Sequence, residues 1–297
     1  MLKIWFLETR PQFLLLSVIL AFLGTSMAWF YQNVLNWGYA LLAGFGLVLT
    51  HISVNTLNDY FDDQSGIDRH TQRTPFSGGS GVLPAEQLKP RQVFWMGAIT
   101  LLMATPIGLF FIIVQGWLLL PLLIVAALCV ILYTPFILKH HWPEWSPGLG
   151  LGLLPVLGTY FALTGAYSMP VLLAAVPSFI LVHNLLLLNE FPDVAADRMA
   201  GRKTLPITLG KARTAAVYST LTVIVYLWIV GCVAARIAPV WTLIALLTLP
   251  AAVSAMRGSF KSDDMTVFIP AMGANVLVVL GTQFLLGLGY MLAVILS

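Results

Sequence analysis

The sequence predicts an all-α polytopic membrane protein with nine transmembrane helices, and two observations lead to this prediction. Of the 297 residues, 59% are hydrophobic and only 9% are charged, whereas a soluble domain usually carries about 25% charged residues. Such a chain has too little polar surface to cover a globule in water. The apolar residues also gather in runs of about 20, the length at which a helix crosses a bilayer. We therefore expect a single membrane-embedded domain over residues 1–297.

Nine apolar segments follow one another along the chain, separated by turns and charged loops. The first segment follows Arg10-Pro11 and is long enough to be a span, and no small-residue cleavage site marks it as a signal peptide. The last is the longest, and a tilt or a break at a glycine would accommodate its length. The expected spans are 12–30, 38–57, 92–114, 117–138, 148–166, 169–188, 212–234, 239–256 and 268–296.

The charged residues indicate how these spans are oriented. Nine spans place alternate loops on opposite sides of the membrane, and 14 of the 15 Lys and Arg residues, all but Arg236, then fall on the side of the N-terminus. Cytoplasmic loops carry an excess of Lys and Arg. We therefore expect the N-terminus and the long loops inside a prokaryotic cell membrane and the C-terminus outside. Because the bases are explained by topology, neither a nucleic-acid partner nor an obligatory protein partner is predicted.

The acidic residues are concentrated after the second span, in the stretch NDYFDDQSGID, residues 58–68. If the helix of that span continues, its polar residues lie on one stripe at helical spacing. Polar groups inside a membrane are costly and usually face a cavity. The alternative is a solvated helix end with a turn at Gly66. The expected stripe holds His51, Asn55, Asn58 or Asp59, and Asp62.

A second acidic cluster follows the sixth span, in the stretch NEFPDVAADRMAGRKTLP, residues 189–206. Asn189, Asp193 and Asp197 are four residues apart, so they are expected on one helical face, with a kink or restart at Pro192. Basic residues follow at once. Because the two clusters lie four spans apart, they indicate a weak internal repeat of a four-helix unit.

The residue types in the two clusters favour a phosphate–metal complex as the ligand. Carboxylate and amide oxygens suit Mg²⁺, which is typically held by one or two carboxylates together with substrate phosphates. Arg and Lys suit the remaining phosphate oxygens. A transporter or channel is an alternative of a different class, but the charges gather at one membrane face rather than at the midplane.

These motifs resemble those of the UbiA superfamily of intramembrane aromatic prenyltransferases, and the resemblance covers nearly the whole chain. Arg10-Pro11 resembles the pair that opens the first helix of the family, and NEFPDVAAD followed by TLP resembles the second aspartate-rich motif. The spacing Asn58-x3-Asp62-x5-Asp68 resembles the menaquinone branch, since the benzoate-using branch more often has aspartates four apart. The stretch YTPFILK, from Tyr133 to Lys139, is similar to a conserved Tyr and Lys element, although an interfacial tyrosine with a snorkelling lysine would look the same.

The sequence also departs from the family pattern. The menaquinone branch often has a glycine-rich stretch that ends in Gly-Glu after the lysine, whereas HHWPEWSPGLGLG stands here with Glu144 displaced. The stretch SGGSGVLP, residues 77–84, lacks the ending of a P-loop and is expected to be a flexible cover over the site. Cys129 and Cys232 lie inside apolar runs and are expected to be packing residues.

The resemblance implies Mg²⁺-dependent transfer of a polyprenyl group from its diphosphate to an aromatic acceptor at the membrane. The acceptor it favours is 1,4-dihydroxy-2-naphthoate, with 4-hydroxybenzoate, homogentisate, haem or geranylgeranylglyceryl phosphate as alternatives. The expected metal ligands are Asn58, Asp59, Asp62, Asp68, Asn189, Asp193 and Asp197. The expected diphosphate ligands are Arg69, Arg73, Lys139, Arg198 and Lys203. The expected catalytic residues are Asp68, Lys139 and Asp193, and the expected acceptor or pocket residues are Arg10, His51, Asn55, Tyr133 and His183.

Overall fold

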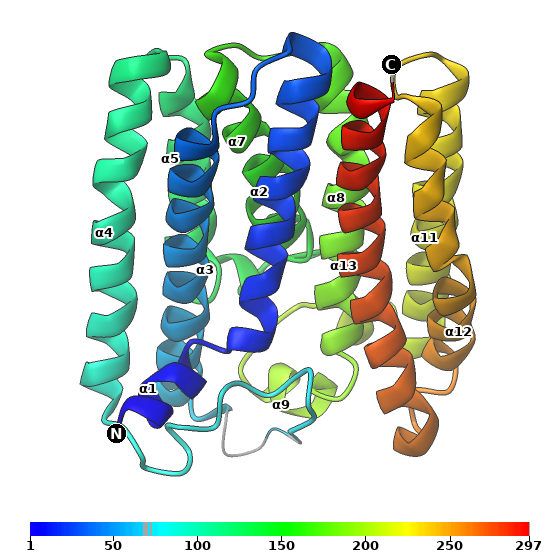
Figure 1. Ribbon diagram of the computed structural model, residues 1–297. Helices are drawn as coiled ribbons and strands as arrows, with labels where there is room; N and C mark the ends of the chain where they lie inside the picture. Colours follow the sequence, from blue (N-terminus) through cyan, green and yellow to red (C-terminus); the bar gives the residue numbers. More distant parts are fainter. Residues whose placement is uncertain (68–70, 72, 297) are drawn as a thin grey trace.

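The computed structural model describes residues 1–67, 71 and 73–296. These residues form helices and connecting loops without any strand, and the long helices run side by side from one end of the molecule to the other (Figure 1). Eight helical segments are long and apolar enough to cross a membrane. The expected span at 117–138 is represented by a helix of 14 residues, α5 (Leu119–Leu132). The all-helical prediction is confirmed, but the count of nine spans is not.

The other elements correspond closely to the expected spans, with short helices added at the polar end of the bundle. Those before α5 are α1 (Leu2–Glu8), α2 (Pro11–Gln32), α3 (Trp37–Ser65) and α4 (Pro90–Gln115). Those after it are a 3-10 turn η2 (Ile137–Lys139), α6 (Trp145–Pro147), a π-helical stretch η3 (Gly148–Leu153), α7 (Leu154–Thr164), α8 (Met169–Asn189), α9 (Val194–Met199), α10 (Leu205–Thr208), α11 (Lys211–Ala234), a 3-10 stretch η4 (Val240–Thr248), α12 (Leu249–Ser259) and α13 (Met265–Ile295).

Helix α3 continues to Ser65 instead of ending near residue 57, and its two ends explain why. The side chain of Asn36 accepts a hydrogen bond from the backbone N–H of Tyr39, which satisfies a donor that the first turn leaves unpaired. Gly66 ends the helix with a φ of +73°, a left-handed conformation that glycine adopts without steric cost. The acidic stretch that begins at Asn58 is therefore helical and keeps a regular spacing.

The second acidic cluster spans the end of one helix and the start of the next, with the expected restart at Pro192. Helix α8 ends at Asn189, a turn follows through Pro192, and α9 begins at Val194 with Asp193 in the N-cap position. Because proline has no N–H and clashes with the preceding turn, Pro192 favours a break in the helix here. Asp193 and Asp197 remain one turn apart, since the N–H of Asp197 donates to the carbonyl of Asp193 at 2.8 Å.

Helix α13, by contrast, is unbroken from Met265 to Ile295 despite its glycines. It packs along α2, and together with α7 and α8 these helices enclose the largest apolar core. Gly24 of α2 allows one close approach, because a Cβ there would lie 2.7 Å from the carbonyl oxygen of Val156. Both cysteines are buried and free, as expected.

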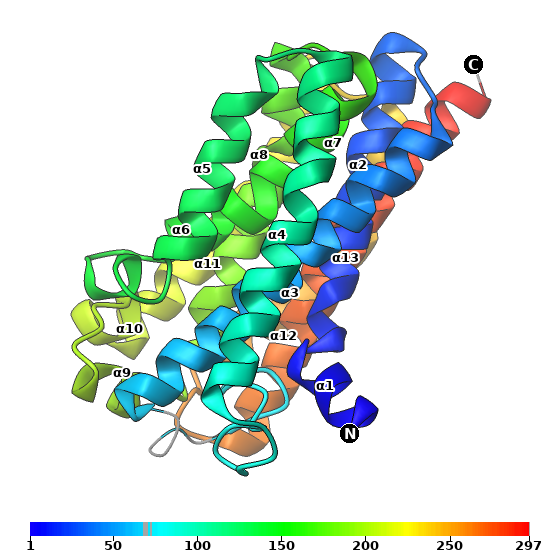
Figure 2. The same cartoon turned by 90° about the vertical axis from the view of Figure 1, so that its left-hand side faces the viewer.

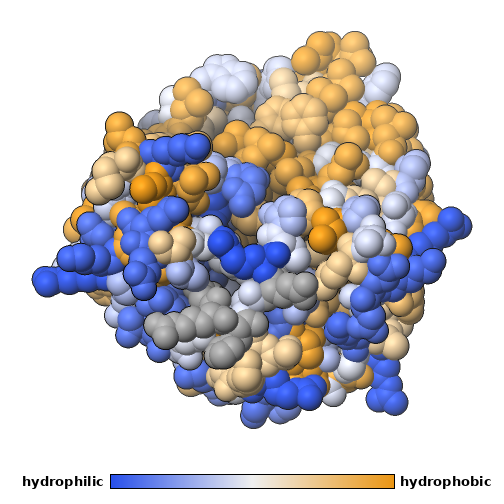
Figure 3. Space-filling view, turned by 90° about the horizontal axis from the view of Figure 1, so that it is seen from below, coloured by the Kyte–Doolittle hydropathy of each residue, from blue (hydrophilic) through white to orange (hydrophobic). Residues whose placement is uncertain are grey.

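The two termini lie at opposite ends of the bundle, with the N-terminus at the lower end in Figure 1. The connection between α3 and α4 and the segment that carries α9 also lie at the lower end, and Figures 1 and 2 agree on this arrangement. Hydrophilic side chains gather on this end face (Figure 3). The two acidic clusters thus meet at one end of the molecule, on a chain that is a multi-pass membrane protein.

Candidate active site

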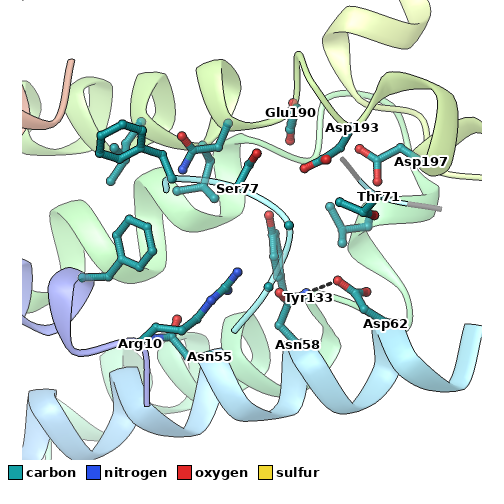
Figure 4. Close-up of a pocket in the computed structure, with 18 of the residues that line it drawn as sticks. Arg10, Asn55, Asn58, Asp62, Thr71, Ser77, Tyr133, Glu190, Asp193 and Asp197 are labelled. Carbon is teal, nitrogen blue, oxygen red and sulfur yellow. Dashed lines mark hydrogen bonds between the residues drawn. The ribbon is translucent and has the colours of Figure 1, made fainter. Parts of the chain in front are cut away.

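A polar cavity of about 950 Å³, measured with its open mouth, lies at this end of the bundle. Its walls come from segments far apart in the sequence: the start of α2, the end of α3, the chain after α5, and the region from α8 to α10 (Figure 4). The loop that precedes α4 contributes Phe76, Ser77, Gly78 and Gly79.

The polar stripe of α3 forms one wall of this cavity. His51, Asn55, Asn58 and Asp62 all line it, as helical spacing on a continuous helix predicts. The amide of Asn58 donates to Asp62 Oδ2 at 3.2 Å and to the hydroxyl of Thr134 at 3.0 Å. These bonds fix the amide so that its oxygen is left for a ligand in the cavity.

Asp59 is not among the residues that line the cavity, although it follows Asn55 by one helical turn. Only 2% of it is exposed. Its Oδ2 accepts a hydrogen bond from the N–H of Ser80 at 2.8 Å, and its Oδ1 lies 3.7 Å from the guanidinium of Arg10. Asp59 therefore joins α3 to the loop before α4 and to the residue that precedes α2.

The second acidic cluster forms the facing wall of the cavity, where Asn189, Asp193 and Asp197 are joined by Glu190. In the described part of the chain, the Oδ1 atom of Asp193 is buried without a hydrogen-bond partner. The carboxyl group of Glu190 is also buried and lies within hydrogen-bonding reach of Glu144. Burial, together with the neighbouring Asp197, raises the pKa of Asp193 to about 8. Burial and the nearby Glu144 raise the pKa of Glu190 well above its usual value. Several buried carboxyl groups close to one another favour a cation at this place.

Arg202 joins the two walls. Its guanidinium donates to Asp197 Oδ1 at 2.8 Å and also forms an ion pair with Asp62 Oδ1. A turn at Gly201, with a φ of +74°, reverses the chain after α9 so that Arg202 faces back toward Asp197. Arg202 was not among the expected site residues, and neither was Glu190. A signal for Arg202 was present in the sequence, because a glycine follows the acidic cluster immediately before it.

The donor set of the cavity fits Mg²⁺. Asn58 and Asp62 offer hard oxygens from one side, and Asn189, Asp193 and Asp197 offer them from the other. Among the residues that the structure describes, no three His, Cys, Asp or Glu side chains already converge on one point. The guanidinium of Arg202 stands between Asp62 and Asp197 instead, and it supplies the positive charge that these carboxylates require.

The other basic residues that were expected to bind diphosphate lie outside this cavity. Lys139, Arg198 and Lys203 are exposed and do not line it. Arg73 is also exposed, and its guanidinium donates to the carbonyls of Gly78 and Gly79 at 3.1 and 3.3 Å. Asp68 and Arg69 fall outside the described residues, so their expected roles stay predictions.

Four of the five expected acceptor or pocket residues line the cavity, namely Arg10, His51, Asn55 and Tyr133. The fifth, His183, is buried elsewhere. Its Nε2 accepts a hydrogen bond from the indole N–H of Trp142 at 2.9 Å, and its Nδ1 lies 3.2 Å from Asn184 Oδ1. Because an indole nitrogen can only donate, Nε2 is the acceptor and the proton is on Nδ1. His183 thus supports the chain that carries Trp142.

Apolar space continues inward from the polar cavity. A second cavity shares Asn58, Tyr133 and Leu151 with the first, and a third is lined mainly by apolar residues of α3, α4, α5 and α7. Leu151 of the π-helical stretch lines all three. A ligand with a charged head in the polar cavity could therefore extend an apolar tail among the helices.

Comparison with known proteins agrees with this geometry. Residues 15–272 match the model of the UbiA prenyltransferase family. The chain belongs to the UbiA prenyltransferase family. It is therefore a prenyltransferase and a multi-pass membrane enzyme.

Individual relatives cover almost the whole chain. The 1,4-dihydroxy-2-naphthoate octaprenyltransferase of Bacillus subtilis is 28% identical over 289 residues, which are 96% of this chain and 91% of that protein. The structure of a UbiA homologue from Aeropyrum pernix superimposes with a TM-score of 0.72 at 17% identity, covering 94% of this chain and 97% of the other. A UbiA homologue from Archaeoglobus fulgidus, bound to GPP and Mg²⁺, gives a TM-score of 0.65 at 13% identity, covering 95% and 99%.

Proposed function

We propose that this prenyltransferase moves a polyprenyl group from its diphosphate to 1,4-dihydroxy-2-naphthoate in a Mg²⁺-dependent reaction of menaquinone synthesis. The observation that carries the proposal is the convergence of two acidic clusters, about 130 residues apart, on one cavity that continues into apolar space. The acceptor is supported by the name of the Bacillus subtilis relative and by the spacing of the first motif.

The polar cavity is the proposed site of the diphosphate. Asn58, Asp62, Asn189, Asp193 and Asp197 would hold Mg²⁺, which when bound neutralises the diphosphate and stabilises it as a leaving group. The guanidinium of Arg202 already lies between the two walls and would contact the diphosphate oxygens in a bidentate manner. Arg69, Arg73, Lys139, Arg198 and Lys203 remain proposed diphosphate ligands from the surrounding loops.

The prenyl tail would extend past Leu151 into the apolar cavity between α3, α4, α5 and α7. An apolar chamber keeps water away from the allylic cation that forms as the C–O bond weakens. The tail would also explain why the enzyme lies in a membrane.

The acceptor would lie beside the diphosphate, where Arg10 meets apolar side chains. The guanidinium of Arg10 lies 5.8 Å from the ring centroid of Phe13, and Phe13, Phe76 and Leu186 line the same cavity. A flat aromatic acid suits such a place, because its ring packs against aromatic residues while its carboxylate pairs with Arg10. If the attacked ring carbon bears the carboxylate, loss of CO₂ returns an electron pair to the ring, and no proton has to be removed.

The test is a panel of acceptors against one labelled prenyl diphosphate. The purified enzyme in nanodiscs, with Mg²⁺, should convert 1,4-dihydroxy-2-naphthoate to a prenylated product and release CO₂ in equal amount. It should not prenylate 4-hydroxybenzoate at a comparable rate. Prenylation of 4-hydroxybenzoate or homogentisate in preference to the naphthoate would contradict the proposed acceptor. Full activity in excess chelator would contradict the proposed dependence on Mg²⁺.

The orientation in the membrane also remains a proposal. The excess of Lys and Arg at the lower end in Figure 1 supports a cytoplasmic site in a prokaryotic cell membrane, with the C-terminus outside. Labelling of single cysteines by a membrane-impermeant reagent in intact cells tests it. Labelling near residue 295 without labelling near residue 87 is the expected result.

A further inference from the structure

The short helix α1 is amphipathic, and only one of its faces is covered by protein. Ile4 and Trp5 pack against a cluster formed by the loop before α4 and the first turn of α4. The opposite face is apolar but exposed, with Leu2 88% and Phe6 61% accessible. Leu2 and Phe6 are four residues apart and so lie side by side on one face of the helix. Large apolar side chains that lie together on a surface mark a place where lipid or another protein makes contact.

The position of α1 indicates what that occupant is. Helix α1 ends at Glu8, and only Thr9 and Arg10 separate it from Pro11, where the first membrane span begins. The cluster that covers its inner face includes Val93, which lies in the first turn of the span α4. In Figures 1 and 2, α1 lies at the lower end of the bundle and protrudes at its side. At this level a multi-pass membrane protein meets the boundary between lipid head groups and acyl chains.

The covered face of α1 is joined to the cavity by a chain of hydrogen bonds. Glu8 is fully buried, and its Oε2 accepts a hydrogen bond from the hydroxyl of Ser80 at 2.7 Å. The N–H of Ser80 donates to Asp59 Oδ2 at 2.8 Å, and the N–H of Val82 donates to the Ser80 hydroxyl at 3.1 Å. Ser80 follows Gly78 and Gly79, which line the cavity. The glycine loop is therefore fastened to α1 on one side and to α3 on the other.

We propose that α1 is an interfacial anchor that inserts Leu2 and Phe6 into the lipid boundary and, through Glu8 and Ser80, holds the glycine loop over the cavity. The partner is the bilayer itself. A helix of seven residues binds lipid only weakly alone, but α1 is tethered to a span and needs only local insertion. The proposal depends on the membrane fold and not on the identity of the acceptor.

The first experiment measures whether position 6 lies in lipid. A nitroxide is attached to Phe6→Cys in nanodiscs of phosphatidylethanolamine and phosphatidylglycerol, and its collision rates with oxygen and with a water-soluble nickel chelate are compared. Leu277→Cys, on the exposed face of α13, is the lipid reference, and Gln87→Cys, in the exposed loop, is the aqueous reference. Cys129 and Cys232 are buried, and the parent protein, treated with the same reagent, measures any background labelling of these two cysteines.

The label at position 6 should favour oxygen, as at Leu277. A preference for the nickel chelate, as at Gln87, would overturn the anchor.

The second experiment measures the link to the glycine loop by hydrogen exchange in the same nanodiscs. The double variant Leu2→Asp/Phe6→Asp should increase exchange at the amides of Ser80 and Val82 by about tenfold, because their bonds open more often. Lys3→Gln, a matched change on the same helix, should leave both amides unchanged. Ser80→Ala should reproduce the increase at Val82.

If the label lies in lipid but the double variant exchanges like the parent, the proposed coupling is wrong. Protection of helix α3 amides serves as the check that each variant is folded.

Discussion

The two acidic clusters have similar spacings in the sequence but are built differently. The α3 cluster, Asn58, Asp59 and Asp62, lies on an uninterrupted helix. The α8–α9 cluster, Asn189, Asp193 and Asp197, spans the end of one helix, a turn through Pro192 and the start of another. On the unbroken helix, spacing decides the direction of each side chain, so Asp62 faces the cavity and Asp59 faces Ser80. In the α8–α9 cluster, the turn through Pro192 decides the direction of each side chain.

The largest loss of activity is expected when one cavity-lining aspartate of either cluster is replaced. Asp62→Asn and Asp193→Asn should each lower the rate of prenyl transfer by about 10³-fold, because each removes a charged oxygen that stabilises the metal and leaving group. Steady-state rates in nanodiscs measure this, with thermal unfolding as the control for folding. If either variant kept near-normal activity, its cluster would not be needed for the reaction, and the two walls would not contribute equally to the site.

Arg202 should give the next largest effect. Arg202→Gln should lower the rate by about 10²-fold, since a guanidinium that contacts both walls is lost. Without metal it should also lower the melting temperature, because Asp62 and Asp197 lose the ion-pair partner that they share. Added Mg²⁺ should then raise the melting temperature of the variant more than that of the parent. Arg213→Gln is the matched control, since Arg213 is exposed and does not line the cavity.

The high pKa of Asp193 predicts a dependence of metal binding on pH. Without metal this carboxyl holds its proton up to a pH of about 8. Mg²⁺ must displace that proton, so its apparent affinity should rise by about tenfold per pH unit between pH 6 and 8 and level off above that range. Titration calorimetry at several pH values measures it. An affinity that does not change with pH, or a slope that persists in Asp193→Asn, would contradict the assignment of the proton to Asp193.

Asp59 sharpens the comparison within the α3 cluster. Asp59→Ala should lower the rate by about tenfold, because the loop at Ser80 and the position of Arg10 depend on it, while the Mg²⁺ dependence stays that of the parent. Asp62→Asn should instead shift the Mg²⁺ dependence. A shift in Asp59→Ala as large as that in Asp62→Asn would mean that Asp59 is a metal ligand after all.

The smallest effect is expected at Asp63. It follows Asp62 by one position on the same helix and does not line the cavity, so Asp63→Ala should change the rate by less than about twofold. The same rate assay measures it, with Asp62→Asn as the reference. A large loss of activity would show that helical spacing on α3 does not predict which side chains face the cavity.

The part of the site that was predictable from the sequence is the part that lies on regular helices. Apolar length predicted the eight segments that form long apolar helices, and the period of α3 predicted that His51, Asn55, Asn58 and Asp62 share a wall. The meeting of two distant clusters was inferred from composition, since both combine hard oxygens with bases.

What could not be predicted depends on turns and on tertiary packing. Arg198, Arg202 and Lys203 are equally basic in the sequence, but only Arg202 lies in the cavity, because α9 ends at Met199 and the chain reverses at Gly201. His183 lies on the same helix as residues of the cavity, but its ring accepts a hydrogen bond from Trp142 instead. Trp142 lies in an irregular loop, and helical spacing does not predict where such a loop runs. Helix α5 is also shorter than the expected span 117–138, because it ends at Leu132 and the chain continues in turns.

The central claim is that the two clusters form one site, and a double-mutant cycle on ligand binding tests it most directly. Calorimetry would measure Mg²⁺-dependent binding of a non-reactive prenyl thiolodiphosphate to the parent, Asp62→Asn, Asp193→Asn and the double variant. We predict that each single variant loses most of the binding and that the double variant loses little more, because both residues act on the same bound complex. Losses that simply add, or a variant that retains half of the bound metal, would show two independent sites and contradict the account.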